Sequence, residues 1–220
     1  MTSLPDDWLD RIAAVPGRAR AEDLSRFVPP DDGGRPSAVL LLFSEGVDAS
    51  GAGPDVLLTE RSATMRSHPG QVSFPGGALE ADDEGPVDAA LREAVEETGL
   101  DRHGVDVLGQ LPSLFLPPSG YVVTPVLGRW STPSPVAAVD RAEVARVVRA
   151  PLAELLDPAN RFVSRHPSGY VGPAFRVQGL YVWGFTAGLL SRLLALAGLE
   201  QPWDRSRQED LPAEILALLP

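Results

Sequence analysis

The stretch GGALEADDEGPVDAALREAVEETGL, residues 76–100, carries the strongest structural pattern in the chain. It predicts a helix over 86–98, because proline is well tolerated at the first helical position and Gly99 can end a helix in the left-handed conformation. One side of this helix is formed by small and apolar residues at helical spacing, namely Val87, Ala90, Leu91, Ala94, Val95 and Thr98. The other side is acidic, so we expect one buried face and one charged face.

Three glutamates of this helix, Glu93, Glu96 and Glu97, occupy positions i, i+3 and i+4 and therefore share one side. Like charges at this spacing repel by about 0.2–0.5 kcal/mol per pair. Three glutamates alone are most often a solvated acidic face. The alternative is a cluster of carboxylates for a hard divalent cation, Mg²⁺ or Mn²⁺, which prefers oxygen ligands and would relieve the repulsion.

The segments on either side of this stretch alternate between short apolar runs and longer helical patterns. We predict strands at 38–43, 55–59, 71–74, 105–108, 121–127 and 143–148, the first two joined as a hairpin with a long loop. We predict further helices at 7–15, 151–156 and 181–196. This order predicts the α/β class, with a mixed sheet covered on both faces by helices.

The turn-rich segment FVPPDDGGRPS at 27–37 separates the first predicted helix from the rest of the chain. We therefore divide the chain into an N-terminal helix and connector at 1–36, a main domain at 37–200 and a C-terminal tail at 201–220. The tail mixes charge, proline and a short apolar patch. We expect it to be only partly ordered.

The composition excludes several classes of function. The chain of 220 residues has no cysteine, which rules out disulfides, thiolate nucleophiles and cysteine-based metal sites. All 19 basic residues are arginine, which rules out Schiff-base catalysis and a phosphate-binding loop with its lysine. A net charge of −11 disfavours binding to nucleic acid or anionic membranes. With an acidic start and no uninterrupted apolar span, we expect a cytoplasmic enzyme or binding protein.

The acidic stretch resembles the signature of the Nudix hydrolases. That signature reads Gly, five residues, Glu, seven residues, then Arg-Glu-apolar-any-Glu-Glu-any-Gly-apolar. Seven residues separate Glu84 from Arg92, as in the signature, but six residues separate Gly77 from Glu84. The loop is thus one residue longer, and either Asp83 or Glu84 fills the role of the loop carboxylate.

A second segment, LLTERSATMRSHPGQVSFPGG at 57–77, is similar to the coenzyme A pyrophosphatase branch of this superfamily. The pattern of that branch is Leu-Leu-Thr-any-Arg-Ser, three residues, Arg, three residues, Gly, three residues, Phe-Pro-Gly-Gly, and every fixed position is present. The longer loop also occurs in that branch. The two motifs abut, so chance is a poor explanation for the match.

The resemblance implies a Nudix-type α/β/α sandwich with a mixed β-sheet flanked by helices. It also implies metal-dependent cleavage of the diphosphate of coenzyme A or its derivatives into 4′-phosphopantetheine and adenosine 3′,5′-bisphosphate. Glu93 and Glu97 are the first choice as ligands of Mg²⁺ or Mn²⁺, with Glu96 close behind and a backbone carbonyl near Gly77 as a further oxygen ligand. Such ions lower the pKa of an attacking water and neutralise a leaving phosphate.

The remaining roles follow from side-chain chemistry. Arg92 is expected to organise the helix and the loop by pairing with a carboxylate. Arg61 and Arg66 are candidates for binding the diphosphate or the 3′-phosphate, because a guanidinium matches phosphate geometry. Phe74 is expected either to pack against the substrate or to belong to the core. The general base stays open, with Glu96, Glu97 and Glu143 as candidates.

Two other functions remain open. The acidic helix indicates the reaction and not the attached group, so ADP-ribose or a dinucleotide is an alternative substrate. A sensor that binds a nucleotide without cleaving it ranks lower, because all three glutamates are present. In each case the partner is a small molecule, and a homodimer is possible by analogy with other Nudix enzymes.

Overall fold

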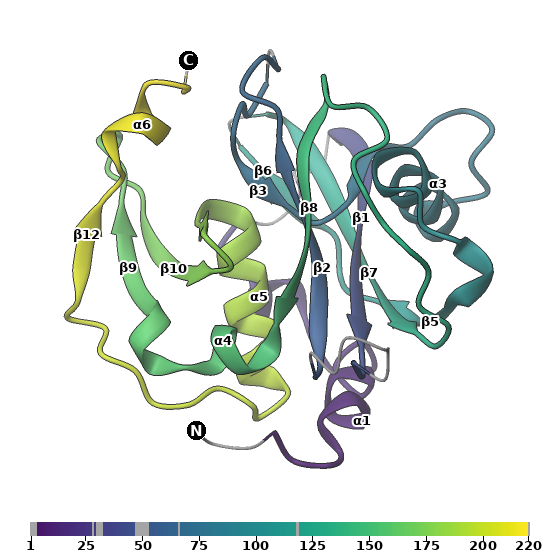
Figure 1. The fold of residues 1–220 in the computed structure, drawn as a ribbon, viewed down its shortest axis with the longest axis horizontal. Helices are drawn as coiled ribbons and strands as arrows, with labels where there is room; N and C mark the ends of the chain where they lie inside the picture. The colour runs from purple at the N-terminus through teal and green to yellow at the C-terminus, as the bar shows by residue number, and fades with distance from the viewer. Residues whose placement is uncertain are drawn as a thin grey trace.

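The computed structural model describes residues 4–27, 29, 33–46, 53–65, 67–117 and 119–219 (Figure 1). Two sheets and a set of helices form the fold, as expected for the α/β class. The first sheet has the order β3-β2-β1-β7-β5, with β4 paired to β1, β6 to β7 and β8 to β2. Its strands are β1 (Arg35–Ser44), β2 (Asp55–Arg61), β3 (Val72–Ser73), β4 (Gly76–Ala78), β5 (Val105–Gln110), β6 (Leu114–Leu116), β7 (Tyr121–Trp130) and β8 (Val144–Pro151).

Strand β1 is the centre of the first sheet, and it pairs in parallel with β7 and antiparallel with β2 and β4. Its side chains alternate between two cores, as those of a strand buried on both faces must. Leu40 and Leu42 belong to the core under helix α3 (Pro86–Thr98), whereas Leu41 and Phe43 belong to the core around helix α5 (Gly184–Leu196). The sheet is therefore covered on both faces by helices.

The second sheet has the order β11-β10-β9-β12. It consists of β9 (Arg161–Arg165), β10 (Val171–Val177), β11 (Leu180–Val182) and β12 (Gln208–Asp210). Helix α5 lies between the two sheets (Figure 1), and one continuous core joins its buried residues to both. The shorter helices are α1 (Trp8–Ala13), α2 (Ala21–Leu24), α4 (Leu152–Leu156) and α6 (Ala213–Leu216).

Several predictions of secondary structure are confirmed. Helix α3 spans Pro86–Thr98, with Gly99 in the left-handed region at φ 70°. The predicted hairpin is present, although only two residue pairs join β1 to β2, one of them Phe43 with Val56, and most of β2 pairs with β8 instead. No helix among the described residues is long and apolar enough to cross a membrane.

Two expectations were wrong, and two strands were missed. The last long helix starts at Gly184 and not at Tyr181, because Leu180–Val182 pairs as strand β11 with β10. The tail is not loosely ordered, because its residues Gln208–Asp210 pair in parallel with β9 and are followed by helix α6. Strands β9 and β10, which belong to the second sheet, were not among the strands predicted from short apolar runs. The division into 1–36, 37–200 and 201–220 stays a prediction.

Candidate active site

Two glycines allow helix α3 to approach strand β4 closely. Gly76 and Gly77 pair with β1, opposite Val39 and Ala38. A Cβ atom on Gly77 would collide with the carboxylate of Glu93, and a Cβ atom on Gly76 would collide with the carbonyl oxygen of Ala38. The Gly-Gly pair therefore leaves the space in which the acidic side chains of α3 meet the backbone.

Glu97 is the most buried of the three glutamates, with 8% of its surface exposed. The N–H of Gly76 donates a hydrogen bond to its Oε2 atom at 3.3 Å. Burial raises the pKa of Glu97 to about 7, and the carboxylates of Glu93 and Glu143 add to the rise. The guanidinium of Arg61 opposes it, which places Arg61 within electrostatic range of Glu97.

Glu93 lies one turn earlier, and 18% of its side chain is exposed. Burial raises the pKa of Glu93, and the neighbouring Arg92 opposes this rise. Glu93 and Glu97 are thus two adjacent carboxylates that have lost most of their contact with water. A positive charge placed between them would favour their ionised forms.

Arg92 ties the helix to the loop before it. Its Nε and Nη2 atoms donate to the two carboxylate oxygens of Asp83 at 3.0 Å each, and Nη2 also donates to the carbonyl oxygen of Ala78 at 3.1 Å. Its Nη1 atom donates to Glu93 and Glu96, both at 3.1 Å. The Asp83 carboxylate raises the pKa of Arg92, which is charged throughout the usual range.

The pairing distinguishes the two candidate loop carboxylates. The side chain of Asp83 is only 3% exposed, and hydrogen bonds from Arg92 and from the N–H of Glu80 lower its pKa. Glu84 is exposed at the next position. The structure therefore brings Asp83 and not Glu84 to Arg92, and this holds the longer loop against the helix.

Glu96 differs from its two neighbours. Its side chain is 58% exposed and pairs with Arg92. In keeping with this, the described part of the chain has no group of three or more His, Asp or Glu side chains gathered to hold a metal ion. The three glutamates share one side of the helix, but only Glu93 and Glu97 lie close to the Gly76–Gly77 backbone.

Without Glu96, the carboxylates of Glu93 and Glu97 remain as oxygen donors, and they fit a hard divalent cation. Two largely buried carboxylates lie beside the backbone of Gly76 and Gly77. Burial raises the pKa of both carboxylates more than the neighbouring arginines lower it, so a cation bound between them would favour their ionised forms. Oxygen donors of this kind suit Mg²⁺ or Mn²⁺, which commonly take one or two carboxylates and complete their coordination with water and substrate phosphate.

The three residues predicted to bind substrate differ in where they lie. Arg61 ends strand β2, and its Nε atom is buried without a hydrogen-bond partner among the described residues. Arg66 lies outside the described residues. Phe74 is 2% exposed and packs in the core around α5, so its ring cannot stack on a ligand. Burial of Phe74 thus favours the second of the two expectations for it, a place in the core.

Backbone contacts of the site were not predicted from the sequence. The N–H of Gly76 bonds to Glu97, and the carbonyl oxygen of Ala78 accepts from Arg92. The N–H of Ser62 donates to the carbonyl oxygen of Glu143 at 2.8 Å, which brings the start of β8 to the end of β2. The Gly-Gly pair is a signal that could have indicated close backbone approach, whereas no sequence signal indicated the link between Ser62 and Glu143.

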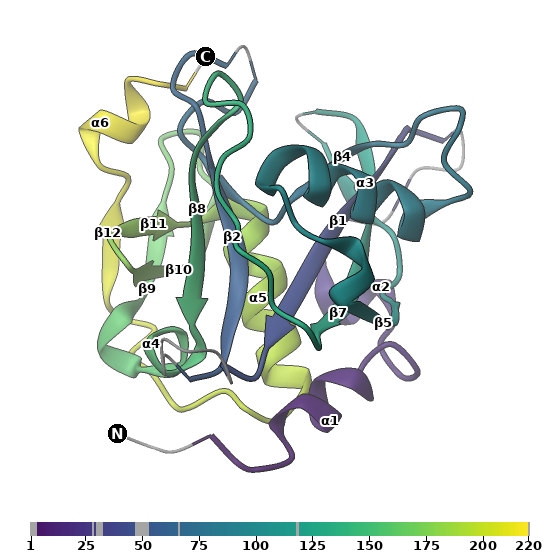
Figure 2. The same cartoon turned by 45° about the vertical axis from the view of Figure 1, so that its right-hand side comes forward.

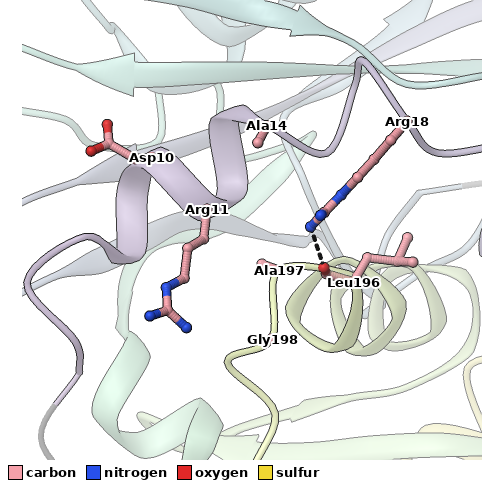
Figure 3. Close-up of a pocket in the computed structure, with 7 residues that line it drawn as sticks. All are labelled: Asp10, Arg11, Ala14, Arg18, Leu196, Ala197 and Gly198. Carbon is pink, nitrogen blue, oxygen red and sulfur yellow. Dashed lines mark hydrogen bonds between the residues drawn. The ribbon is translucent and has the colours of Figure 1, made fainter.

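A separate pocket lies where helix α1 meets the end of α5 (Figure 3). Arg18 there donates to the carbonyl oxygen of Leu196 at 2.5 Å, a bond that caps the C-terminal end of α5 (Figure 3). Arg11 pairs with Asp7 at 2.8 Å. The pocket shares no lining residue with the acidic site, and both of its arginines already have partners.

Comparison with known proteins identifies the family. A sequence model of the NUDIX domain matches residues 34–168. The uncharacterized Nudix hydrolase NudL of Citrobacter koseri is 36% identical over 201 residues, which cover 88% of this chain and 95% of that protein. The NudL protein of Cronobacter sakazakii is 44% identical over 156 residues, covering 68% of this chain and 78% of that protein.

The fold has a counterpart among solved structures. The Nudix hydrolase RenU of M. smegmatis superposes with a TM-score of 0.53 at 20% identity, covering 81% of this chain and 98% of that one. This similarity concerns the fold alone, whereas the family match and the NudL relatives concern the sequence. Together with the Gly-Gly pair and the acidic helix, they show that this chain belongs to the Nudix hydrolase family.

Proposed function

We propose that this Nudix-family pyrophosphatase hydrolyses the diphosphate bond of coenzyme A or its derivatives, giving 4′-phosphopantetheine and adenosine 3′,5′-bisphosphate. The observation that carries the reaction class is the pair of largely buried carboxylates, Glu93 and Glu97, held against the Gly76–Gly77 backbone with Arg61 within electrostatic range. The pattern at 57–77 supports coenzyme A as the substrate.

The site would divide the reaction among a few side chains. Glu93 and Glu97 would hold Mg²⁺ or Mn²⁺, which when bound polarises phosphoryl oxygens and lowers the pKa of a bound water. Arg61 is partly exposed at the end of β2 and acts electrostatically on Glu97, so its guanidinium would bind a phosphoryl oxygen. Arg92 would keep the loop and the helix in register through Asp83. The general base stays open among Glu96, Glu97 and the exposed Glu143, whose carboxylate lies within electrostatic range of Glu97.

Product analysis tests the reaction and the substrate together. Three samples of the purified protein, each containing Mg²⁺, are incubated separately with coenzyme A, ADP-ribose or NADH. We expect adenosine 3′,5′-bisphosphate from coenzyme A at the highest kcat/KM of the three. Faster cleavage of ADP-ribose or NADH would overturn the assigned substrate, and binding without cleavage of any of them would indicate the sensor function.

Two variants test the carboxylates. Glu93→Gln should abolish turnover and also abolish the rise in melting temperature that Mg²⁺ causes in the original protein. Glu96→Gln is the matched control, because Glu96 lies on the same helix and side but is 58% exposed and paired with Arg92. Glu96→Gln should keep the rise in melting temperature with Mg²⁺, and equal loss of that rise in both variants would contradict the assignment of Glu93 and Glu97 as the principal ligands.

A further inference from the structure

The C-terminal arm, residues 200–219, lies outside the stretch matched by the family sequence model. It is nevertheless anchored to the second sheet at its start. Arg161 of β9 is fully buried, pairs with Glu200 at 2.9 Å and donates to Ser191 of α5 at 2.7 Å. Its guanidinium carbon lies 4.7 Å from the ring centre of Trp203. These contacts hold the first residues of the arm in one place.

The middle of the arm is anchored by backbone pairing. Gln208–Asp210 forms strand β12, which pairs in parallel with β9. Glu209 pairs with Arg176 at 2.8 Å, and the N–H of the buried Leu211 donates to the carbonyl oxygen of Arg165 at 3.1 Å. The arm is therefore a fixed extension of the second sheet as far as helix α6.

The end of the arm reaches the segment between β2 and β3. A Cβ atom on Gly70 would collide with the Cδ1 atom of Leu218, so this leucine lies directly on the bare backbone of Gly70. Gly70 has a φ of 66°, which other residues rarely adopt. Figure 2 shows the C-terminal end beside the loop that joins β2 to β3.

The base of the segment between β2 and β3 lies next to the acidic site. The N–H of Arg61 donates to the carbonyl oxygen of Gln71 at 2.9 Å, which closes the base of the loop. Ser62 bonds to the backbone of Glu143, whose carboxylate lies within electrostatic range of Glu97. The loop of residues 62–71, which we call the β2–β3 loop, is thus held at its base by the site and at Gly70 by Leu218.

We propose that Leu218 is a positioning residue for the β2–β3 loop, through which the C-terminal arm sets the affinity for substrate. This inference rests on the proposed function, which assigns a phosphoryl oxygen of the substrate to Arg61 at the base of the loop. Leu218 touches the loop and not the reacting atoms. Its loss should therefore change substrate binding and leave the chemical step intact.

The test compares Leu218→Ala with Leu219→Ala in the full chain. The two leucines are neighbours and both are half-buried, so the second variant controls for a general loss of apolar surface. The first readout is amide hydrogen exchange in peptides that cover residues 62–71, measured without substrate. The second readout is KM and kcat for coenzyme A. Tryptophan fluorescence, to which Trp203 contributes, is used to check that the arm remains docked.

We expect Leu218→Ala to speed exchange in the β2–β3 loop and to raise KM about fivefold with kcat unchanged, because a truncated leucine loses only part of its buried surface. Leu219→Ala should change neither, and Leu218→Met should restore both. Unchanged exchange in the loop, or a fall in kcat with an unchanged KM, would overturn the inference. Faster exchange in a protein that cleaves no coenzyme A would instead overturn the proposed function while the contact stands.

Discussion

At the scale of single residues, the site depends on charges that have been removed from water. Glu97 combines an exposed fraction of 8% with one hydrogen bond from Gly76, and its neighbours Glu93 and Glu143 are also acidic. Such a group is costly to ionise in the absence of a cation. The burial for which we propose Glu97 as a metal ligand should therefore make the protein less stable when no cation is bound.

Replacing Glu97 by glutamine should remove this cost. The pKa of Glu97 rises from 4.5 to about 7 on folding, so its contribution to stability is fully present below pH 4.5 and is lost as the pH rises through 7. At pH 8 the ionised carboxylate costs on the order of 3 kcal/mol. In EDTA, Glu97→Gln should raise the free energy of unfolding at pH 8 and have little effect at pH 4.5, as measured by urea denaturation. The same difference at both pH values would contradict this account.

Replacing Asp83 by asparagine should loosen the loop before α3. The two hydrogen bonds to Arg92 would lose their charge, and one amide nitrogen would face a guanidinium. We expect kcat/KM to fall about tenfold, as is typical when a group that orients a ligand is changed. Glu84→Gln is the control because Glu84 is exposed, and it should retain nearly full activity. The reverse order of effects would assign the loop role to Glu84.

At the scale of secondary-structure elements, strand β9 connects the arm to helix α5. Its Arg161 is fully buried between the rings of Phe175 and Trp203, at 4.9 and 4.7 Å from their centres. Glu200 is the carboxylate that pairs with it. A buried charge without its partner is strongly destabilising, whereas a pair at the surface contributes little.

Glu200→Gln should therefore destabilise the protein by about 3 kcal/mol, because Arg161 cannot move its charge into water. The control is Asp210→Asn on the same arm, which removes the partner of Arg165 from a pair that is largely exposed. That change should cost less than about 1 kcal/mol. Urea denaturation followed by tryptophan fluorescence measures both, and equal effects would show that burial of Arg161 is not decisive.

At the scale of the whole molecule, helix α5 joins two sheets into one folding unit. Its buried residues share a core with β1 and β2 on one side and with β10 and β11 on the other. The family sequence model ends at residue 168, so α5 and most of the second sheet lie beyond the matched stretch. These later elements nonetheless pack on the same core as the matched domain.

A cavity in α5 should accordingly destabilise the entire protein at once. Leu193 is fully buried, and Leu193→Ala should cost about 3 kcal/mol. Because both sheets depend on this helix, unfolding should remain a single transition by circular dichroism and by tryptophan fluorescence. Val139→Ala is the control, since Val139 is 62% exposed. The free energy of unfolding of this variant should be nearly that of the original protein. Two separate transitions in the Leu193 variant would show that the sheets fold independently.

The sequence by itself determined helix α3 and the identity of its acidic residues. The helix was predictable because its signals are local: a proline at its start, a glycine at its end and a 3.6-residue apolar repeat between them. The motif spacing likewise indicated the family, which the comparisons confirmed. Neither inference required knowledge of distant contacts.

Only the tertiary structure decided which of these residues lose contact with water and what holds them. It paired Arg92 with Asp83, placed Phe74 in the core and left Glu96 exposed. It also ordered the tail, because the partners of Glu200 and of β12 lie about 40 residues earlier, in β9. Burial and long-range pairing depend on which surfaces meet after folding, and a local pattern of residues does not contain that information.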